Sequence, residues 1–165
     1  MKLFETDRLL VRKFFVDDAD NFFLINSNVD VMHFIRPVKN KKECDDFLQE
    51  NITIYQKNSV VGRYAVIEKA SGIFVGNFSF LYLSDEVNYH NGYALLPDFW
   101  GKGFAQELVK YGIDFFFSST DKQELFAITD QENIASKNVI LKNGFHEKGV
   151  TIEHDKLLDL FCINR

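Results

Sequence analysis

The stretch NGYALLPDFWGKGFAQE, residues 91–107, decides the fold. Its β-prone residues over 92–96 predict a strand, and Pro97 predicts that the strand ends there in a turn. Gly101 and Gly103 follow the turn, which predicts a loop of unusual backbone conformation. The stretch therefore indicates a strand, a glycine loop and a helix in direct succession.

The helix after Gly103 shows the period of one buried face. Its apolar positions are Ala105, Leu108, Val109, Gly112, Ile113 and Phe116. The first N–H groups of a helix have no intrahelical partners, and the helix dipole favours an anion beside them. The glycines would let a phosphate approach the backbone, and Lys102 adds a positive charge. A glycine pair alone is also explained by a tight turn, and neither G-x-G-x-x-G nor G-x-x-x-x-G-K-[ST] is present.

The surrounding residues are more specific. The run G-Y-A-L-x-P-x-x-W-G-K-G-F-A-x-E resembles the acetyl-coenzyme A (acetyl-CoA) loop of the GNAT N-acetyltransferase superfamily, Q/R-x-x-G-x-G/A. With Trp at the first position, it is similar to the branch that includes ribosomal-protein N-terminal acetyltransferases. The segments 6–12 and 133–145 carry further resemblance. The cofactor loop implied by this resemblance comprises Trp100, Gly101, Lys102, Gly103, Phe104 and Ala105.

The totals describe one domain of ordinary size, residues 1–165. Apolar residues make up 46% and charged residues 26%, and 18 phenylalanines predict an aromatic-rich core. A net charge of −5 argues against nucleic acid and anionic membranes as partners and is compatible with a cationic amine. A charged start and the lack of a long apolar window favour a cytoplasmic protein without a membrane span.

The coarse pattern predicts an α/β (α+β) fold with a mixed, mostly antiparallel sheet flanked by helices. Strands are expected over residues 9–14, 63–69, 73–81, 87–96, 125–129, 147–153 and 157–163. Helices are expected over residues 17–26, 40–55, 103–116 and 133–143. The GNAT resemblance implies that the fourth and fifth strands splay apart and that the pantetheine arm enters the gap. The N–H groups of Leu95 and Leu96, at the splayed end, are candidates for pairing with that arm and for polarising the acetyl carbonyl.

The segment from Asn133 to Phe145 resembles the second family signature, N-x-x-S followed by a lysine and G-F. The resemblance implies that Asn133 binds the cofactor and that Ser136 lies near the sulfur as a proton donor. Asn133 is equally suited to cap a helix, and the two roles are compatible. Many GNAT enzymes carry a tyrosine seven residues after the asparagine as general acid, and Ile140 stands there instead.

His90 is the leading candidate for the general base, because an imidazole can take a proton from an ammonium group directly or through water. The resembling branch often carries an acidic residue at this position, and a lone strand histidine is more often structural. Glu86 is the second candidate. The four histidines show no spacing typical of a metal site, so no metal is expected.

The acceptor pocket is implied to lie beside the first two helices. Met32, His33, Phe34 and Ile35 are its candidates, with core filling as the alternative reading. The sequence as a whole predicts an acetyl-CoA-dependent N-acetyltransferase acting by direct attack of a primary amine, either a small molecule or a protein N-terminus. The alternatives are a GNAT-like module that binds acetyl-CoA without catalysis and a domain for another nucleotide. Monomer and homodimer both stay open.

Overall fold

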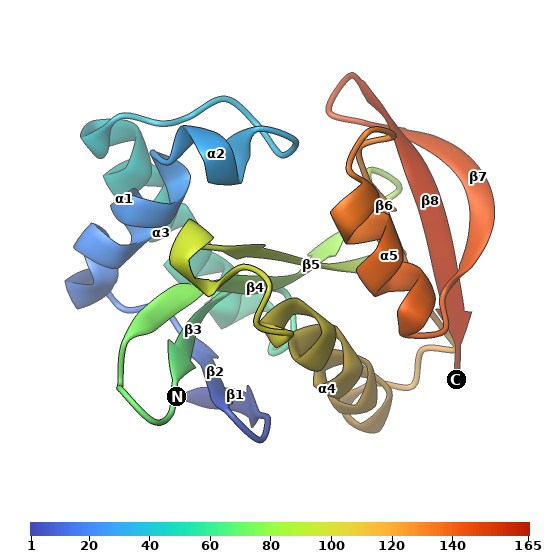
Figure 1. The fold of residues 1–165 in the computed structure, drawn as a ribbon, viewed down its shortest axis with the longest axis horizontal. Coiled ribbons are helices and arrows are strands. Elements are labelled where there is room, and N and C mark those ends of the chain that lie inside the picture. The colour runs from blue at the N-terminus through green and yellow to red at the C-terminus, as the bar shows by residue number, and fades with distance from the viewer.

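A single eight-stranded sheet forms the centre of the protein in the computed structural model, which describes residues 1–165 (Figure 1). The order across the sheet is β1-β2-β3-β4-β5-β6-β8-β7. The strands are β1 (Lys2–Glu5), β2 (Leu9–Lys13), β3 (Gly62–Glu68), β4 (Phe74–Tyr82), β5 (Tyr89–Leu95), β6 (Glu124–Thr129), β7 (His146–Glu153) and β8 (Lys156–Asn164). The helices are α1 (Ala19–Asn26), α2 (Val29–Met32), α3 (Lys41–Lys57), α4 (Phe104–Ser119) and α5 (Ile134–Lys142).

Neighbouring strands are antiparallel except for β5 and β6, which run parallel. Their ladder contains only two residue pairs, His90 with Phe126 and Asn91 with Ala127. Beyond Asn91 the two strands are no longer paired, although β5 continues to Leu95 and β6 to Thr129. The expected mixed, mostly antiparallel sheet and its splay between these strands are therefore confirmed.

The two faces of the sheet carry different helices, because alternate residues of a strand point to opposite sides. On β5, Leu95 belongs to an apolar cluster with α4 and α5, whereas its neighbour Ala94 belongs to a cluster with α1, α2 and α3. The α4 side is rich in aromatic rings: Phe78 and Phe80 lie edge to face with centroids 5.0 Å apart. The aromatic core expected from the composition is confirmed.

Local sequence signals set the ends of the helices. Asn40 and Glu43 form a capping box at the start of α3, as their spacing predicts. At the end of α5, Gly144 has φ +90°, and Phe145 N–H donates to Ile140 O. Both Phe145 and Ile140 are buried in the same cluster, which completes a Schellman motif.

One strand is absent from the sequence expectations: β1, which pairs with β2 at the edge of the sheet. It is too short to show a period in the sequence. The helix α2, a single turn capped by Asn28, lies in the segment 28–39, for which the sequence predicts a loop or a short helix. The remaining strands and helices lie within a few residues of their expected ranges.

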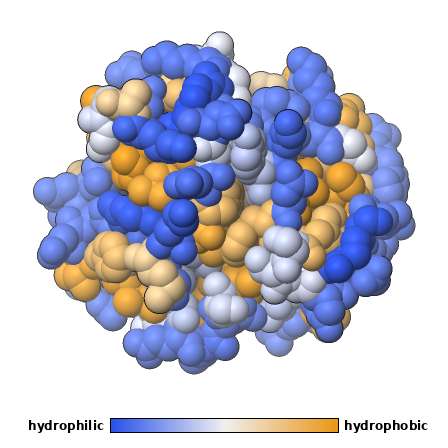
Figure 2. Space-filling model, turned by 90° about the horizontal axis from the view of Figure 1, so that it is seen from below, coloured by the Kyte–Doolittle hydropathy of each residue, from blue (hydrophilic) through white to orange (hydrophobic).

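Part of the apolar content stays at the surface. Seen from below, apolar residues form a band across the molecule between hydrophilic borders (Figure 2). No helix combines the length and the apolar character needed to cross a bilayer. The cellular location stays a prediction.

Replacing Gly76 tests the close approach of β4 and β5 beside the splay. A Cβ atom there would lie 2.1 Å from Ala94 O, and the residue has φ +153°. We expect Gly76→Ala to lower the free energy of unfolding by about 2–4 kcal/mol, measured by urea denaturation. In the control Gly72→Ala, φ is +71° but no atom lies within 4 Å, so a cost of about 1 kcal/mol is expected. Equal costs for the two variants would contradict the steric argument.

Candidate active site

The loop between β5 and α4 presents a row of free backbone N–H groups. Gly101 and Gly103 have φ values of +70° and +78°, in the left-handed region that favours glycine. The N–H of Trp100 donates to Pro97 O, but no oxygen of the protein accepts a hydrogen bond from the N–H groups of residues 101–106. The helix dipole adds positive potential at the same place. The loop is therefore built to hold an anion such as a pyrophosphate.

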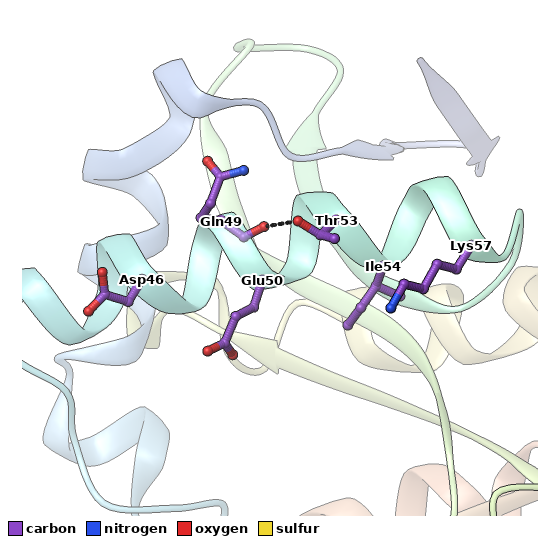
Figure 3. A pocket seen from close by; sticks show the side chains of 6 residues that line it. All are labelled: Asp46, Gln49, Glu50, Thr53, Ile54 and Lys57. Atoms are coloured by element: carbon purple, nitrogen blue, oxygen red, sulfur yellow. Dashed lines mark hydrogen bonds between the residues drawn. The ribbon is translucent and has the colours of Figure 1, made fainter.

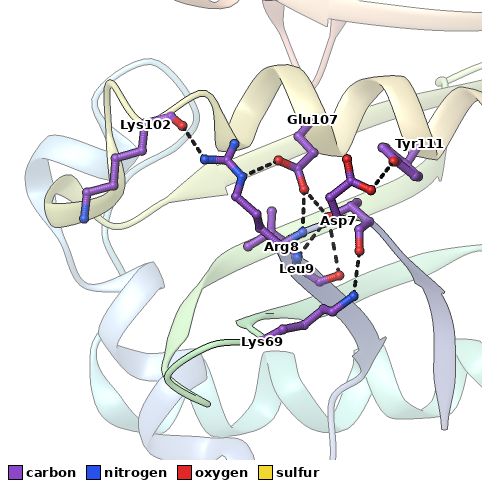
Figure 4. Close-up of polar contacts among 8 residues, drawn as sticks. Asp7, Arg8, Leu9, Lys69, Lys102, Glu107 and Tyr111 are labelled. Carbon is purple, nitrogen blue, oxygen red and sulfur yellow. Dashed lines mark hydrogen bonds and ion pairs between the residues drawn. The ribbon is translucent and has the colours of Figure 1, made fainter.

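Arg8, between β1 and β2, contacts both the loop and Glu107 in the first turn of α4 (Figure 4). Arg8 Nε lies 2.6 Å from Glu107 Oε2, and Arg8 Nη1 donates to Lys102 O over 2.9 Å. Thr6 Oγ1 donates to Glu107 as well, and the Arg8 guanidinium lies 4.5 Å from the centroid of Phe104. Arg8 also approaches Gly103, since a Cβ there would lie 3.5 Å from Nη2. These contacts fix the loop and bring a second cation beside it.

Glu107 is held ionised by this network. Burial alone would raise the pKa of Glu107, but hydrogen bonds from Thr6, from the Arg8 N–H and from the Arg8 guanidinium outweigh it and lower the pKa. The carboxylate consequently stays charged at neutral pH and keeps Arg8 in place. Residue type and spacing assign no role to Arg8 or Glu107; both lie inside segments that resemble the family, 6–12 and 91–107.

The backbone of β5 offers two further donors toward the gap. In an antiparallel ladder, the N–H groups of alternate residues point to alternate sides. Leu96 N–H donates to Val75 O, on the β4 side, so Tyr93 and Leu95 direct their N–H groups toward β6. The unpaired part of β5 includes both residues. The expectation for Leu96 is wrong because its N–H is already used, and Tyr93 takes its place beside Leu95.

Two unpaired polar side chains belong to the elements that border the gap, one at the last paired residue of β5 and one in the first turn of α4. Asn91 Nδ2 on β5 and Gln106 Oε1 on α4 are buried and have no hydrogen-bond partner. A buried polar atom without a partner is costly, so such atoms indicate a ligand with polar groups. The pantetheine arm of acetyl-CoA, with its two amides, has the matching chemistry. The free loop N–H groups and these side chains together fit that cofactor.

The start of α5 faces the same gap. Asn133 Oδ1 caps the helix by accepting from Ser136 N–H over 3.2 Å, which leaves its Nδ2 free of protein partners. Ser136 also interacts through its side chain with Tyr93, whose pKa is raised by burial in spite of that contact. The phenol is therefore protonated at neutral pH. Ile140 is 4% exposed and packs in the core, so no hydroxyl stands at its position.

His90 lies on the other face of β5, toward α1–α3. Burial lowers the pKa of His90 to about 4, and its Nδ1 is buried without a partner. Glu153 and Arg63 act on its charge from β7 and β3. Glu86, the second candidate base, is exposed in the turn between β4 and β5. The imidazole is thus neutral at pH 7 and has an unused nitrogen.

The segment after α2 forms a wall of this second face. Met32 is 2% exposed and belongs to the apolar core, which agrees with core filling, the alternative to a role in the acceptor pocket. His33 and Phe34 lie with ring centroids 4.5 Å apart, and Ile35 is 38% exposed. Lys156 at the start of β8 donates to Phe34 O over 2.9 Å and pairs with Asp130 over 2.8 Å. The segment after α2 and the β7–β8 hairpin are therefore joined across this face (Figure 1).

A shallow hollow on the surface lies away from the loop and the gap. It measures about 420 Å³ and lies along the outer side of α3 (Figure 3). Its wall comes from one helix: Asp46, Gln49, Glu50, Thr53, Ile54 and Lys57. Thr53 Oγ1 donates to Gln49 O within that helix. Because the hollow is shallow and contains no buried unpaired polar atom, we assign it no chemistry.

Comparison with known proteins decides the family. Residues 8–146 match the family described as "Acetyltransferase (GNAT) domain". The chain belongs to the GNAT acetyltransferases. The match includes the loop, α4, β6 and α5. The protein is accordingly an acetyltransferase, and its family uses acetyl-CoA.

Individual relatives agree with this assignment. The chain is 26% identical over 151 residues to the uncharacterized N-acetyltransferase YoaA of Bacillus subtilis, with 90% of this chain and 85% of the relative covered. An acetyltransferase structure from Bacillus anthracis superposes with a TM-score of 0.82 at 23% identity, over 97% and 96% of the chains. The ribosomal L7/L12 α-N-protein acetyltransferase RimL, solved in complex with coenzyme A, gives 0.83 at 16% identity over 99% and 98%.

Replacing Gly103 tests the anion-binding loop. Gly103→Val places a β-branched residue at φ +78° and fills the space a phosphate needs, so acetyl-CoA binding should fall by roughly 100-fold or more. Isothermal titration calorimetry measures the loss. Gly72→Val, at φ +71° in the β3–β4 turn, is the matched control and should bind normally. Tight binding by a folded Gly103→Val protein would remove the loop from the site.

Proposed function

We propose that this GNAT acetyltransferase transfers the acetyl group of acetyl-CoA to a primary amine by direct attack. The observation that carries the proposal is the row of free N–H groups over residues 101–106, accompanied by buried polar atoms without partners on β5 and on the first turn of α4. A pyrophosphate at the loop and a polar arm in the gap would use both. The cofactor supplies a thioester with an electrophilic carbonyl carbon.

Different residues bind the diphosphate and the pantetheine arm of the cofactor. The loop amides, Lys102 and Arg8 hold the diphosphate, while the N–H groups of Tyr93 and Leu95 pair with the arm and polarise the carbonyl oxygen. Asn133 adds its free Nδ2 to cofactor binding. Because Phe104 and Ala105 contribute through the backbone of the first helical turn, their side chains matter less than their conformation.

Proton transfer uses both sides of β5. His90, neutral at pH 7 with an unused Nδ1, is the candidate that accepts the proton of the incoming ammonium group, directly or through water. Ser136 is the candidate donor to the leaving thiolate. Tyr93, whose phenol is protonated and interacts with Ser136, would return a proton to the serine and then regain one from solvent. This pair would replace the tyrosine that is missing at Ile140.

The acceptor is a primary amine of either a small molecule or a protein N-terminus. RimL and a ribosomal-protein-S5-alanine acetyltransferase from Vibrio fischeri, similar in fold, support a protein N-terminus. The hydrogen bond from Lys156 to Phe34 O joins β8 to the segment after α2 across the face where the acceptor would bind, which favours a compact acceptor instead. We also propose that the enzyme is cytoplasmic and is either a monomer or a homodimer.

A thiol-release assay tests the proposal. The protein is incubated with acetyl-CoA and a panel of small amines and N-terminal peptides, and free coenzyme A is measured against a protein-free control. Tight acetyl-CoA binding with no release above the control for any acceptor would favour a non-catalytic binding module. Binding of ATP or NAD in preference to acetyl-CoA would favour a different nucleotide.

The donor pair makes a kinetic prediction. Ser136→Ala should lower kcat by about 10- to 100-fold and change the KM for acetyl-CoA by less than about threefold, because a proton donor acts only in the transition state. Tyr93→Phe should give a smaller loss of kcat. Steady-state rates with the best acceptor of the panel provide both numbers. An unchanged kcat in Ser136→Ala would exclude this serine as the donor.

The pH profile tests His90. Because burial lowers its pKa to about 4, the imidazole stays neutral and able to accept a proton down to that pH, and kcat/KM should fall only below it. His90→Gln should lower kcat/KM and abolish that acid limb, provided circular dichroism shows a folded protein. A profile with the same limb in both proteins would clear His90 of the base role.

A further inference from the structure

Three cations surround one phenylalanine on the acceptor side of the sheet. Arg63 of β3 lies 4.5 Å from the ring centroid of Phe47, which belongs to α3. Lys39 and Arg36, from the segment between α2 and α3, lie 5.1 and 5.2 Å from the same centroid. The cluster therefore brings cations from β3 and from the α2–α3 segment to one ring on α3.

None of the three cations has a carboxylate partner. The seven ion pairs of the protein involve other residues. Arg36 donates only to Asn26 Oδ1, over 3.0 Å, and its Nε is buried without a partner. Arg63 donates no side-chain hydrogen bond; Glu50 influences its charge from α3 without pairing with it. Apart from the hydrogen bond from Arg36 to Asn26, the guanidinium donors of this cluster are thus unused by the protein.

This arrangement is electrostatically unfavourable without a ligand. Burial and the neighbouring charge of Arg36 lower the pKa of Arg63 to about 9, and burial lowers the pKa of Arg36. Contact with an aromatic face compensates for only part of the cost of like charges held together away from water. A compact anion between the cations would remove the repulsion and use the free donors, since a guanidinium fits a carboxylate in bidentate fashion.

The cluster lies on the face where the acceptor is expected. Arg63 stands opposite Ser79, and Ser79 stands opposite Gly92, so the three residues form one row across β3, β4 and β5. His90 lies on the same face, two residues from Gly92 along β5. Two strand spacings and two residues separate Arg63 from His90, about 12 Å between Cα atoms, and the charge of Arg63 acts on His90 over that distance. The helix that begins at the phosphate loop packs on the opposite face.

This face also carries polar side chains that the protein leaves largely unused, Ser79 in the row and Asn77 two residues before it on β4. Asn77 is 5% exposed and makes no side-chain hydrogen bond, and Ser79 makes only one long contact of 3.4 Å with Gly92 O. A Cβ atom at Gly92 would lie 3.1 Å from Ser79 Oγ, so the hydroxyl of Ser79 occupies the space beside this glycine. Together with the cations, these groups provide donors for an anionic group.

We propose that the Arg36, Lys39 and Arg63 cluster binds a carboxylate of the acetyl acceptor, so that the acceptor is an amine that also carries a carboxylate. This inference rests on the proposed amine acetylation. The carboxylate belongs either to an amino-acid-like small molecule or to an acidic residue next to a peptide N-terminus. A purely cationic polyamine does not fit this face.

Matched acceptors test the proposal. Aspartate, β-alanine and 4-aminobutyrate are each compared with their carboxamides, and short peptides beginning Ser-Glu are compared with Ser-Gln. We expect kcat/KM to be at least about tenfold higher for the carboxylate of each accepted pair. The pairs that respond identify the source, small molecule or peptide. Equal rates for acids and carboxamides would overturn the proposal.

Variants tie the preference to the cluster. Arg63→Gln should reduce the acid-to-carboxamide ratio to within about threefold of unity, while Arg63→Lys should keep part of it. The KM for acetyl-CoA should stay unchanged in both. Lys110→Gln removes a cation near Tyr111 on α4, and as the control it should keep the full ratio. A loss in Arg63→Gln that is the same for acids and carboxamides would indicate a structural role only.

A binding measurement separates this inference from the proposed function. Succinate at about ten times its Kd should raise the Tm of the native protein by about 3 °C, and Arg63→Gln should lose the rise, with the diamide of succinic acid as the neutral control. If succinate binds through Arg63 but no acceptor is acetylated, the anion site stands and the proposed function fails. If succinate stabilises both proteins equally, or neither, the anion site is overturned.

Discussion

The parallel ladder between β5 and β6 ends after two residue pairs, and the rest of the site depends on that early end. It leaves the N–H groups of Tyr93 and Leu95 facing a gap, and it allows β5 to run on into the loop at Gly101–Gly103. The helix α4 begins immediately afterwards, with its first N–H groups free. A sheet paired to its full length would have consumed these donors within the protein.

The parts of this design that are local in sequence could be predicted, and the parts that join distant segments could not. The loop, the helix after it and the cap at Asn133 follow from residue types at short spacing, so the sequence locates them. Arg8 and Glu107 are 99 positions apart, and nothing short of the folded chain shows that they meet. The error at Leu96 has a similar origin, because the direction of an N–H depends on which neighbour the strand has.

The two faces of β5 carry different chemistry. The odd-numbered residues of β5 face α4 and α5, on the side that suits a nucleotide and its polar arm. The even-numbered residues, which include His90 and Gly92, face α1–α3, where Arg36, Lys39 and Arg63 gather. The overall charge of −5 is compatible with a cationic amine, yet the local charge of this face is positive. A total charge therefore does not describe a cleft, since a few buried cations outweigh many distant surface carboxylates.

Trp100 is the sole tryptophan of the chain. Its indole N–H donates to Leu95 O over 2.7 Å, and 51% of the residue is exposed at the rim of the loop. The ring is thus anchored to the last residue of β5 and half exposed to solvent, directly before the glycine loop. Its emission is an intrinsic optical reporter of loop occupancy, free of background from any other indole, so stopped-flow fluorescence can follow ligand arrival without a label.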